Sequence, residues 1–259
     1  GKGFPNNNPV VSNQWGELPE GRTWGHTAGI DIDPTDGNIW AYERCAAGGG
    51  GVPRTPIVGS GATGGPVNCD SNLVGPIFKF DRNTGEVLAN FGAGVFTTPH
   101  GIHADNQGNV WVTDFATNTD GTKGQQVHKF SPDGELLMSL GMAGQAGNDS
   151  SHFNQPNDVI VAADGSIFVS DGHTGQGMTT LDAIEEGKQA GRTARIMKFA
   201  SDGTFIKEWG QLGTAHGEFR TPHAMEIDSK NRLWVADRGN HRLEIFDLEG
   251  NYLESRYSF

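Results

Sequence analysis

The sequence lacks several features on which common protein classes depend. Only two of its 259 residues are cysteine, and 19 Lys and Arg face 31 Asp and Glu, a formal net charge of −12. Surfaces that bind nucleic acid or anionic membranes need a basic face, so we expect neither kind of partner. No apolar run approaches the roughly 18–20 residues of a membrane-spanning helix, so we expect no membrane insertion.

Glycine, in contrast, is abundant. The chain contains 39 glycines and 12 prolines, and glycine alone is about twice as frequent as in average proteins. Such a turn-rich composition excludes a helical bundle. Hydrophobic residues make up 35% of the chain, including 6 Trp and 14 Phe, which is enough for a core and too much for disorder.

One sequence pattern occurs four times along the chain. Each copy has two short apolar runs joined by a turn, and in the last three copies the second run closes with an acid: Asp114, Asp171 and Asp237. A hairpin with a similar turn then completes each copy. Four antiparallel strands per repeat are typical of a β-propeller blade.

We therefore predict an all-β propeller with blades at about 25–92, 98–141, 155–210 and 221–257. The segment 1–24 precedes them and is available to pair with a terminal blade. The only helical pattern falls within 179–195, inside an insertion.

Two levels of resemblance refine this prediction. Val235-Ala236-Asp237 followed by Arg238-Gly239-Asn240-His241-Arg242-Leu243 resembles an NHL repeat. The wider sequence, from about Trp24 to Leu253, resembles the peptidyl-α-hydroxyglycine α-amidating lyase family, on three stretches: 99–114, 153–172 and 222–223. The resemblance implies an NHL-type propeller of six blades, whereas this chain contains four repeats. We therefore expect that the protein self-associates or that the missing blades are supplied elsewhere.

The extra length of the repeats always follows the second strand, at 45–76, 115–126 and 172–195. Insertions on one face of a repeat array usually build its binding face. Because neighbouring strands are antiparallel, the starts of the inner strands lie on that same face. This places His100, Asn157 and His223 around one axial mouth with Arg44 and His173.

His100 and His223 occupy equivalent positions, each 14 residues before the acid that closes its repeat. Neutral imidazoles that converge on a channel suit zinc; the alternative is a local hydrogen bond after proline. The resemblance implies zinc at both, and His173, His26 or a partner chain is left to supply the third ligand. The resemblance also implies calcium, bound through the main-chain carbonyls of Ile30 and Ile102.

Two further residues are candidates for catalysis. The resemblance implies that Arg44 binds a substrate carboxylate, as a guanidinium can through two hydrogen bonds; an ordinary surface ion pair is the alternative. His173 stands where the family has a catalytic tyrosine, and histidine can act as a general base near neutral pH.

The two cysteines, Cys45 and Cys69, lie in one glycine-rich stretch. We expect these two cysteines to form a disulfide that closes this loop; two free thiols are the alternative. Disulfides persist in oxidising compartments. Gly1–Trp15 has no basic-then-apolar signal pattern, so we expect any export signal to have been removed. Together these features predict a secreted protein, extracellular or periplasmic.

Three functions fit the sequence, which leaves open whether the protein is an enzyme. The first is a metal-dependent lyase that cleaves the N–C bond of a carbinolamide resembling α-hydroxyglycine, in a small-molecule or peptide-derived substrate. The second is a non-catalytic extracellular propeller that binds ligands or self-assembles, with structural calcium. A sugar-lactone hydrolase is the third, and Asn157 and Asp158 give it partial support.

Overall fold

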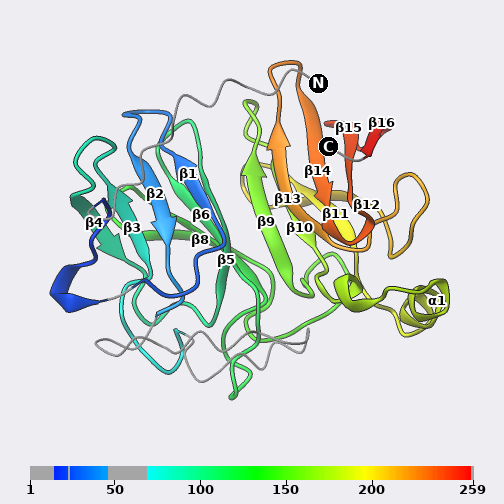
Figure 1. The fold of residues 1–259 in the computed structure, drawn as a ribbon, viewed down its shortest axis with the longest axis horizontal. Coiled ribbons are helices and arrows are strands. Elements are labelled where there is room, and N and C mark those ends of the chain that lie inside the picture. The colour runs from blue at the N-terminus through cyan, green and yellow to red at the C-terminus, as the bar shows by residue number, and fades with distance from the viewer. Residues whose placement is uncertain (1–14, 23, 46–68, 258–259) are drawn as a thin grey trace.

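The computed structural model describes residues 15–22, 24–45 and 69–257, so the loop between the two cysteines and most of the segment 1–24 lie outside the described residues. The described residues form four antiparallel sheets, each of four strands consecutive in the chain (Figure 1). The prediction of an all-β propeller is confirmed. Blade 1 consists of β1 (Ile30–Ile32), β2 (Ile39–Tyr42), β3 (Ile77–Phe80) and β4 (Val87–Phe91).

The other three blades repeat this arrangement. Blade 2 consists of β5 (Pro99–Ala104), β6 (Val110–Asp114), β7 (Gln126–Phe130) and β8 (Leu136–Leu140). Blade 3 consists of β9 (Pro156–Val161), β10 (Ile167–Asp171), β11 (Arg195–Phe199) and β12 (Phe205–Trp209). Blade 4 consists of β13 (Pro222–Ile227), β14 (Arg232–Asp237), β15 (Arg242–Asp247) and β16 (Tyr252–Tyr257).

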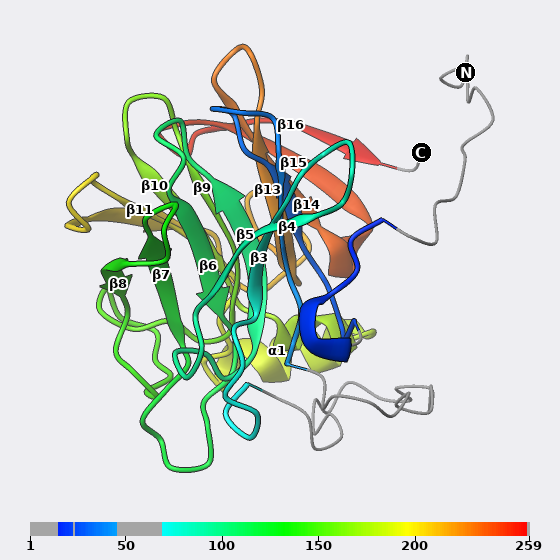
Figure 2. The same ribbon diagram turned by 90° about the vertical axis from the view of Figure 1, so that its left-hand side faces the viewer.

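The inner strands lie side by side in the order β1, β5, β9 and β13. In Figure 2, blade 2 is seen in succession from the innermost strand β5 to β8 at the rim. Buried apolar side chains fill the space between neighbouring blades, for example Trp111 of β6 against Val159 and Met197 of blade 3. Stacking in this way buries sheet faces that no single blade could cover.

The turn between β5 and β6 shows how the repeated motif sets the local structure. Oδ1 of Asp105 accepts hydrogen bonds from the backbone N–H groups of Gln107 (2.9 Å) and Asn109 (3.0 Å). Gly108 adopts a positive φ of 80°, which few other residues tolerate. Oδ2 of Asp105 also accepts the indole N–H of Trp111 at 3.0 Å. One aspartate therefore fixes both the turn and the aromatic residue of the following strand.

The acids that close the second strands hydrogen-bond to the neighbouring backbone. Asp114 accepts the backbone N–H groups of Thr97 and Thr98. Asp171 and Asp237 make similar bonds, and each also pairs at 3.1 Å with the arginine opposite it, Arg195 or Arg242. Blade 2 has Gln126 at that position. Burial raises the pKa of Asp114 to about 7, without a facing arginine to offset it.

The N-terminal segment packs on the first blade. Trp15 and Leu18 contact the cluster formed by Phe78 and Phe80, and the short 3-10 helix η1 (Pro19–Gly21) follows. Arg22 forms an ion pair with the buried Glu43, and its guanidinium lies 4.9 Å from the centre of the Phe78 ring. The face of blade 1 that points away from blade 2 is therefore covered by chain that precedes the blade.

The insertion of blade 3 contains the 3-10 helix η2 (Thr174–Gly177) and the expected helix, α1 (Leu181–Gln189). Thr180 caps α1 by accepting the N–H of Ala183 at its hydroxyl. A further 3-10 helix, η3 (Arg238–Asn240), follows β14. None of the helices in the described residues is long and apolar enough to cross a membrane.

Candidate functional site

Three histidines converge at one end of the inner strands. His100 lies on β5, His223 on β13, and His173 directly after β10 and Gly172. One ring nitrogen of each lies within 4.8 Å of those of the other two. The structure thus joins His173 to the two equivalent histidines. The structure does not bring His26 into this cluster: its side chain is exposed, and its main-chain carbonyl accepts the N–H of Arg44.

All three imidazoles are neutral near pH 7. Burial lowers the pKa of His173 to about 4 and that of His223 to about 3, and it holds the pKa of His100 well below its usual value of 6.5. The positive charges of Arg44 and Arg238 add to this effect, because they disfavour a further cation nearby. The ring nitrogens therefore keep lone pairs available for a metal or a proton donor.

Asn157 lies at the centre of the cluster. The main-chain oxygen of Asn157 accepts a hydrogen bond from Nδ1 of His100 at 2.9 Å, which leaves Nε2 of His100 as the unprotonated nitrogen. The Asn157 side-chain amide donates to the carbonyls of Gly172 (3.1 Å) and Pro222 (3.0 Å). These two residues immediately precede His173 and His223.

Two arginines reach the same mouth. Arg44, which follows β2, donates from Nε to the carbonyl of Pro99 at 2.9 Å. Arg238, at the start of η3, donates from Nη1 to Nε2 of His223 at 2.8 Å, and its Nη2 lies 3.4 Å from Nε2 of His173. In the sequence, Arg238 is recognisable only as part of the NHL repeat, and no local pattern indicates a role at the site.

The disulfide between Cys45 and Cys69 is present, and both sulfur atoms are buried beside the mouth. Cys45 directly follows Arg44, and the backbone N–H of Cys69 donates to the carbonyl of Thr97 at 2.9 Å. The disulfide therefore links the backbone of Arg44 to the segment that leads into His100.

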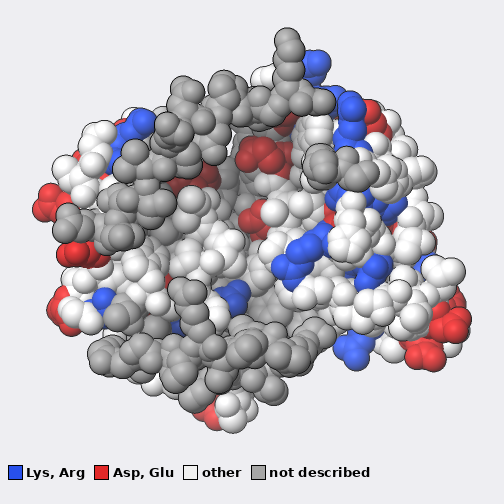
Figure 3. All heavy atoms as spheres, in the orientation of Figure 1, with Lys and Arg blue, Asp and Glu red and all other residues white. Residues whose placement is uncertain are grey.

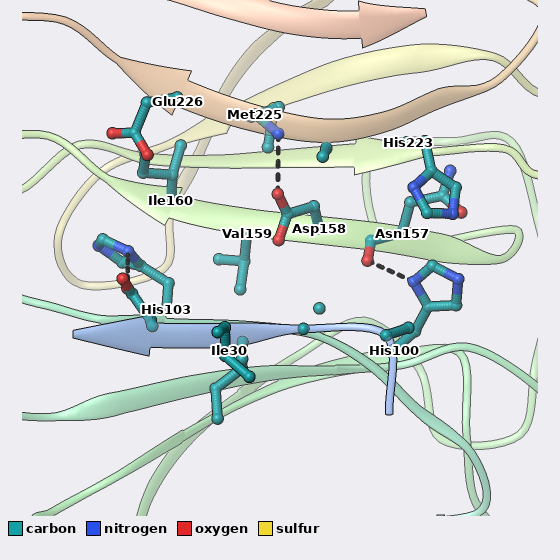
Figure 4. Close-up of a pocket in the computed structure, with 16 residues that line it drawn as sticks. Ile30, His100, His103, Asn157, Asp158, Val159, Ile160, His223, Met225 and Glu226 are labelled. Atoms are coloured by element: carbon teal, nitrogen blue, oxygen red, sulfur yellow. Dashed lines mark hydrogen bonds and ion pairs between the residues drawn. The ribbon is translucent and has the colours of Figure 1, made fainter. Parts of the chain in front are cut away.

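A channel of about 350 Å³ runs along the inner strands from His100 and His223 to the opposite end, where Asp31, His103 and Glu226 line it (Figure 4). The Asp158 side chain lies between the two ends and accepts the N–H of Met225 at 2.8 Å. Burial raises the pKa of Asp158 to about 7. The space-filling view shows acidic side chains in the upper part of the central hollow and basic ones lower down (Figure 3).

The fold and the repeats define the class of protein: an NHL-type β-propeller. A family model of the NHL repeat matches residues 219–246. The solved virginiamycin B lyase from Staphylococcus aureus has the same type of fold, with a TM-score of 0.52 at 13% identity over 93% of this chain and 58% of that one.

Within this class, the chain is similar to peptidyl-α-hydroxyglycine α-amidating enzymes, as the sequence indicated. It is 36% identical over 194 residues to the mouse peptidyl-glycine α-amidating monooxygenase, a match that covers 71% of this chain and 17% of that enzyme. It is 31% identical over 193 residues to peptidyl-α-hydroxyglycine α-amidating lyase 1 of Drosophila melanogaster, over 70% of this chain and 31% of that protein. The chain thus spans well under half of the length of either relative.

Proposed function

We propose that this propeller is the catalytic part of a metal-dependent lyase that cleaves the N–C bond of a carbinolamide resembling α-hydroxyglycine. The observation that carries the proposal is the cluster of three neutral histidines with Arg44 at the same mouth. The similarity to the amidating lyases supports the same reaction.

The histidine cluster fits zinc. Catalytic zinc sites commonly have three protein ligands and keep a fourth position for water or substrate. His100, His173 and His223 would hold the metal, and the hydrogen bond from Nδ1 of His100 to Asn157 resembles the outer-shell bonds that orient metal-binding imidazoles. Bound zinc would act as a Lewis acid that lowers the pKa of a substrate hydroxyl. In this proposal His173 is a metal ligand and not the general base that the sequence suggested.

Arg44 would anchor the substrate. Its Nε donates to the carbonyl of Pro99, and its guanidinium also interacts with the hydroxyl of Tyr42. The guanidinium carries further N–H groups, with which it can bind a carboxylate. With the carboxylate held there, the hydroxyl loses its proton, the carbon–oxygen bond becomes a carbonyl as the N–C bond breaks, and the amide nitrogen takes up a proton. The products are a carboxamide and an aldehyde acid.

Arg238 would adjust to ligand binding. Its guanidinium donates to the His223 nitrogen that faces it and lies close to His173, so it competes with a metal for those lone pairs. A bound carboxylate offers Arg238 a stronger, charge-assisted partner. We therefore expect Arg238→Gln to raise the zinc affinity of the protein in the absence of carboxylates.

The test is turnover of N-benzoyl-α-hydroxyglycine by the zinc-loaded protein, with benzamide release followed by chromatography. The proposal expects release well above the rate without protein, at least a hundredfold slower release by Arg44→Gln, and none above background by His223→Ala. Release at the background rate after loading with zinc, cobalt or manganese would overturn the lyase assignment.

A second candidate function is a non-catalytic, self-assembling propeller with structural calcium. Ile30 and Ile32 of the inner strand β1 are 68% and 60% exposed, which favours contact with another chain. The carbonyls of Ile30 and Ile102 and the carboxylate of Asp158 are the oxygen ligands that calcium prefers, and all three residues line the channel. Sedimentation with and without calcium distinguishes this function: a monomer in both conditions would contradict it.

We also propose that the protein works outside the cytosol, either extracellularly or in a periplasm. The buried disulfide supports this location, since such bonds persist in oxidising compartments. Fractionation of the source cells, with the oxidation state of Cys45 and Cys69 as a second readout, tests it.

A further inference from the structure

We propose that Asn157 is the positioning residue of the histidine cluster: its amide holds the backbones that carry His173 and His223 at a fixed separation from His100. The inference deepens the proposed function, on which its metal-binding readout rests. Asn157 occupies, in blade 3, the position that His100 and His223 occupy in blades 2 and 4, and it is fully buried.

Asn157 reaches the backbone next to two histidines and the ring of the third. Its Nδ2 donates one hydrogen to the carbonyl of Gly172 and the other to that of Pro222, at 3.1 and 3.0 Å. Its main-chain oxygen accepts from His100 at 2.9 Å. Asn157, on the blade between blades 2 and 4, therefore bonds to all three parts of the cluster. A histidine ring at this position could not make the same two donations with one nitrogen.

The unpaired oxygen of the same amide supports a fixed orientation. Oδ1 of Asn157 is buried and has no hydrogen-bond partner among the residues described by the structure. Exchanging Oδ1 and Nδ2 by rotating the amide would break both donated bonds, because Oδ1 would then face the carbonyl oxygens of Gly172 and Pro222. The two donated bonds are therefore retained although a buried acceptor stays unsatisfied, a combination that is rare in folded proteins.

The local backbone leaves little freedom for other arrangements. Gly172 has a φ of 110°, and a Cβ there would lie 2.0 Å from the carbonyl oxygen of Thr193. Its N–H donates to the carbonyl of Gln155 at 3.1 Å. The peptide before His173 is thus confined on both sides. The Asn157 amide links the carbonyl of Gly172 to that of Pro222 on β13 of blade 4.

The experiment compares Asn157→Leu, which is close in size but cannot donate, with Asn90→Leu. Asn90, on the outer strand β4, is a control matched in its hydrogen bonds, because its Nδ2 also donates to two backbone carbonyls, those of Gly75 and Ile77. Unlike Asn157, it is exposed and lies far from the histidines. In metal-free protein labelled at histidine, the rings of His100, His173 and His223, whose centres are 5.0 to 5.5 Å apart, should give nuclear Overhauser contacts. Asn157→Leu should lose these contacts, because each of the three involves His173 or His223, and Asn90→Leu should keep them all.

The second readout is cobalt binding followed by its visible absorption. We expect Asn157→Leu to weaken cobalt binding by about 10- to 100-fold, as for other residues that orient metal ligands, and to change the spectrum. If Asn157→Leu does not fold, Asn157→Asp serves, since a carboxylate there would repel both carbonyls. Unchanged ring contacts in the folded variant would overturn the inference. Intact contacts in the wild type without any cobalt binding would instead overturn the metal site and leave the positioning role in place.

Discussion

Zinc binding to this protein should be almost insensitive to mild acid. The perturbation is a change from pH 7.5 to pH 5.5, at which an exposed histidine becomes mostly protonated and can no longer bind metal. Imidazoles with the ordinary pKa of about 6.5 would weaken zinc binding below about pH 6. The structure lowers the pKa of His173 to about 4 and that of His223 to about 3, through burial and the nearby arginines.

The two expectations differ by orders of magnitude. An imidazole of pKa 6.5 is about 9% neutral at pH 5.5, so a site that needs three of them would lose about a thousandfold in affinity. With the lowered pKa values, His173 and His223 stay more than about 95% neutral at pH 5.5. The pKa of His100 also lies well below 6.5, so the affinity of the site should fall by less than about tenfold.

Isothermal titration calorimetry with zinc at both pH values measures the difference, in buffers without carboxylates that would occupy Arg44. His173→Ala is the control and should weaken binding equally at the two pH values. A loss of more than about a hundredfold in the wild type would refute the argument, because it would show that the histidines titrate as they do in water.

Four other outcomes are expected. His128 is buried beside Phe96, and its pKa in the folded protein, about 4, lies below the unfolded value of 6.5. The stability that it contributes is therefore lost as the pH falls. In urea titrations, His128→Gln should reduce the loss of unfolding free energy between pH 7.5 and pH 5 by about 2 kcal/mol. Burial raises the pKa of Asp114 in the folded protein to about 7, so the stability that its protonated form contributes is lost as the pH rises. Gln126→Arg places a cation opposite this carboxylate and should add about 2 kcal/mol to the unfolding free energy at pH 8, and less at pH 5. Arg22→Met leaves the buried Glu43 without that cation and should cost about 3 kcal/mol of unfolding free energy; a loss below about 0.5 kcal/mol would show that the pair is not needed. Replacing Cys45 and Cys69 by serine should weaken benzoylglycine binding at least tenfold through Arg44 and leave zinc affinity unchanged; equal losses in both would indicate a general loss of stability.

The sequence predicted the repeated elements well, because their signals are local. Turns such as the one at Asp105 are set by residues within four positions, and the period between repeats identified His100 and His223 as equivalent. It also placed His173 at the same mouth, because an insertion begins there.

The remaining features of the site depend on contacts between distant segments. His173 joins the cluster through the path of the chain after Gly172, and Arg238 reaches two histidines from a short 3-10 helix that the sequence did not indicate. The ion pair of Arg22 with Glu43 likewise joins residues on separate elements. No periodicity encodes such distances, so only the folded chain could reveal them.

The N-terminal cover on blade 1 has a consequence for the order of folding during synthesis. Each blade consists of strands adjacent in the chain, so each can form from contacts of short sequence separation as it leaves the ribosome. Trp15, Leu18 and Arg22 are made before the strands that they cover. The first blade can therefore be shielded on one face before the second exists, and each later blade can then dock on a surface that has already formed.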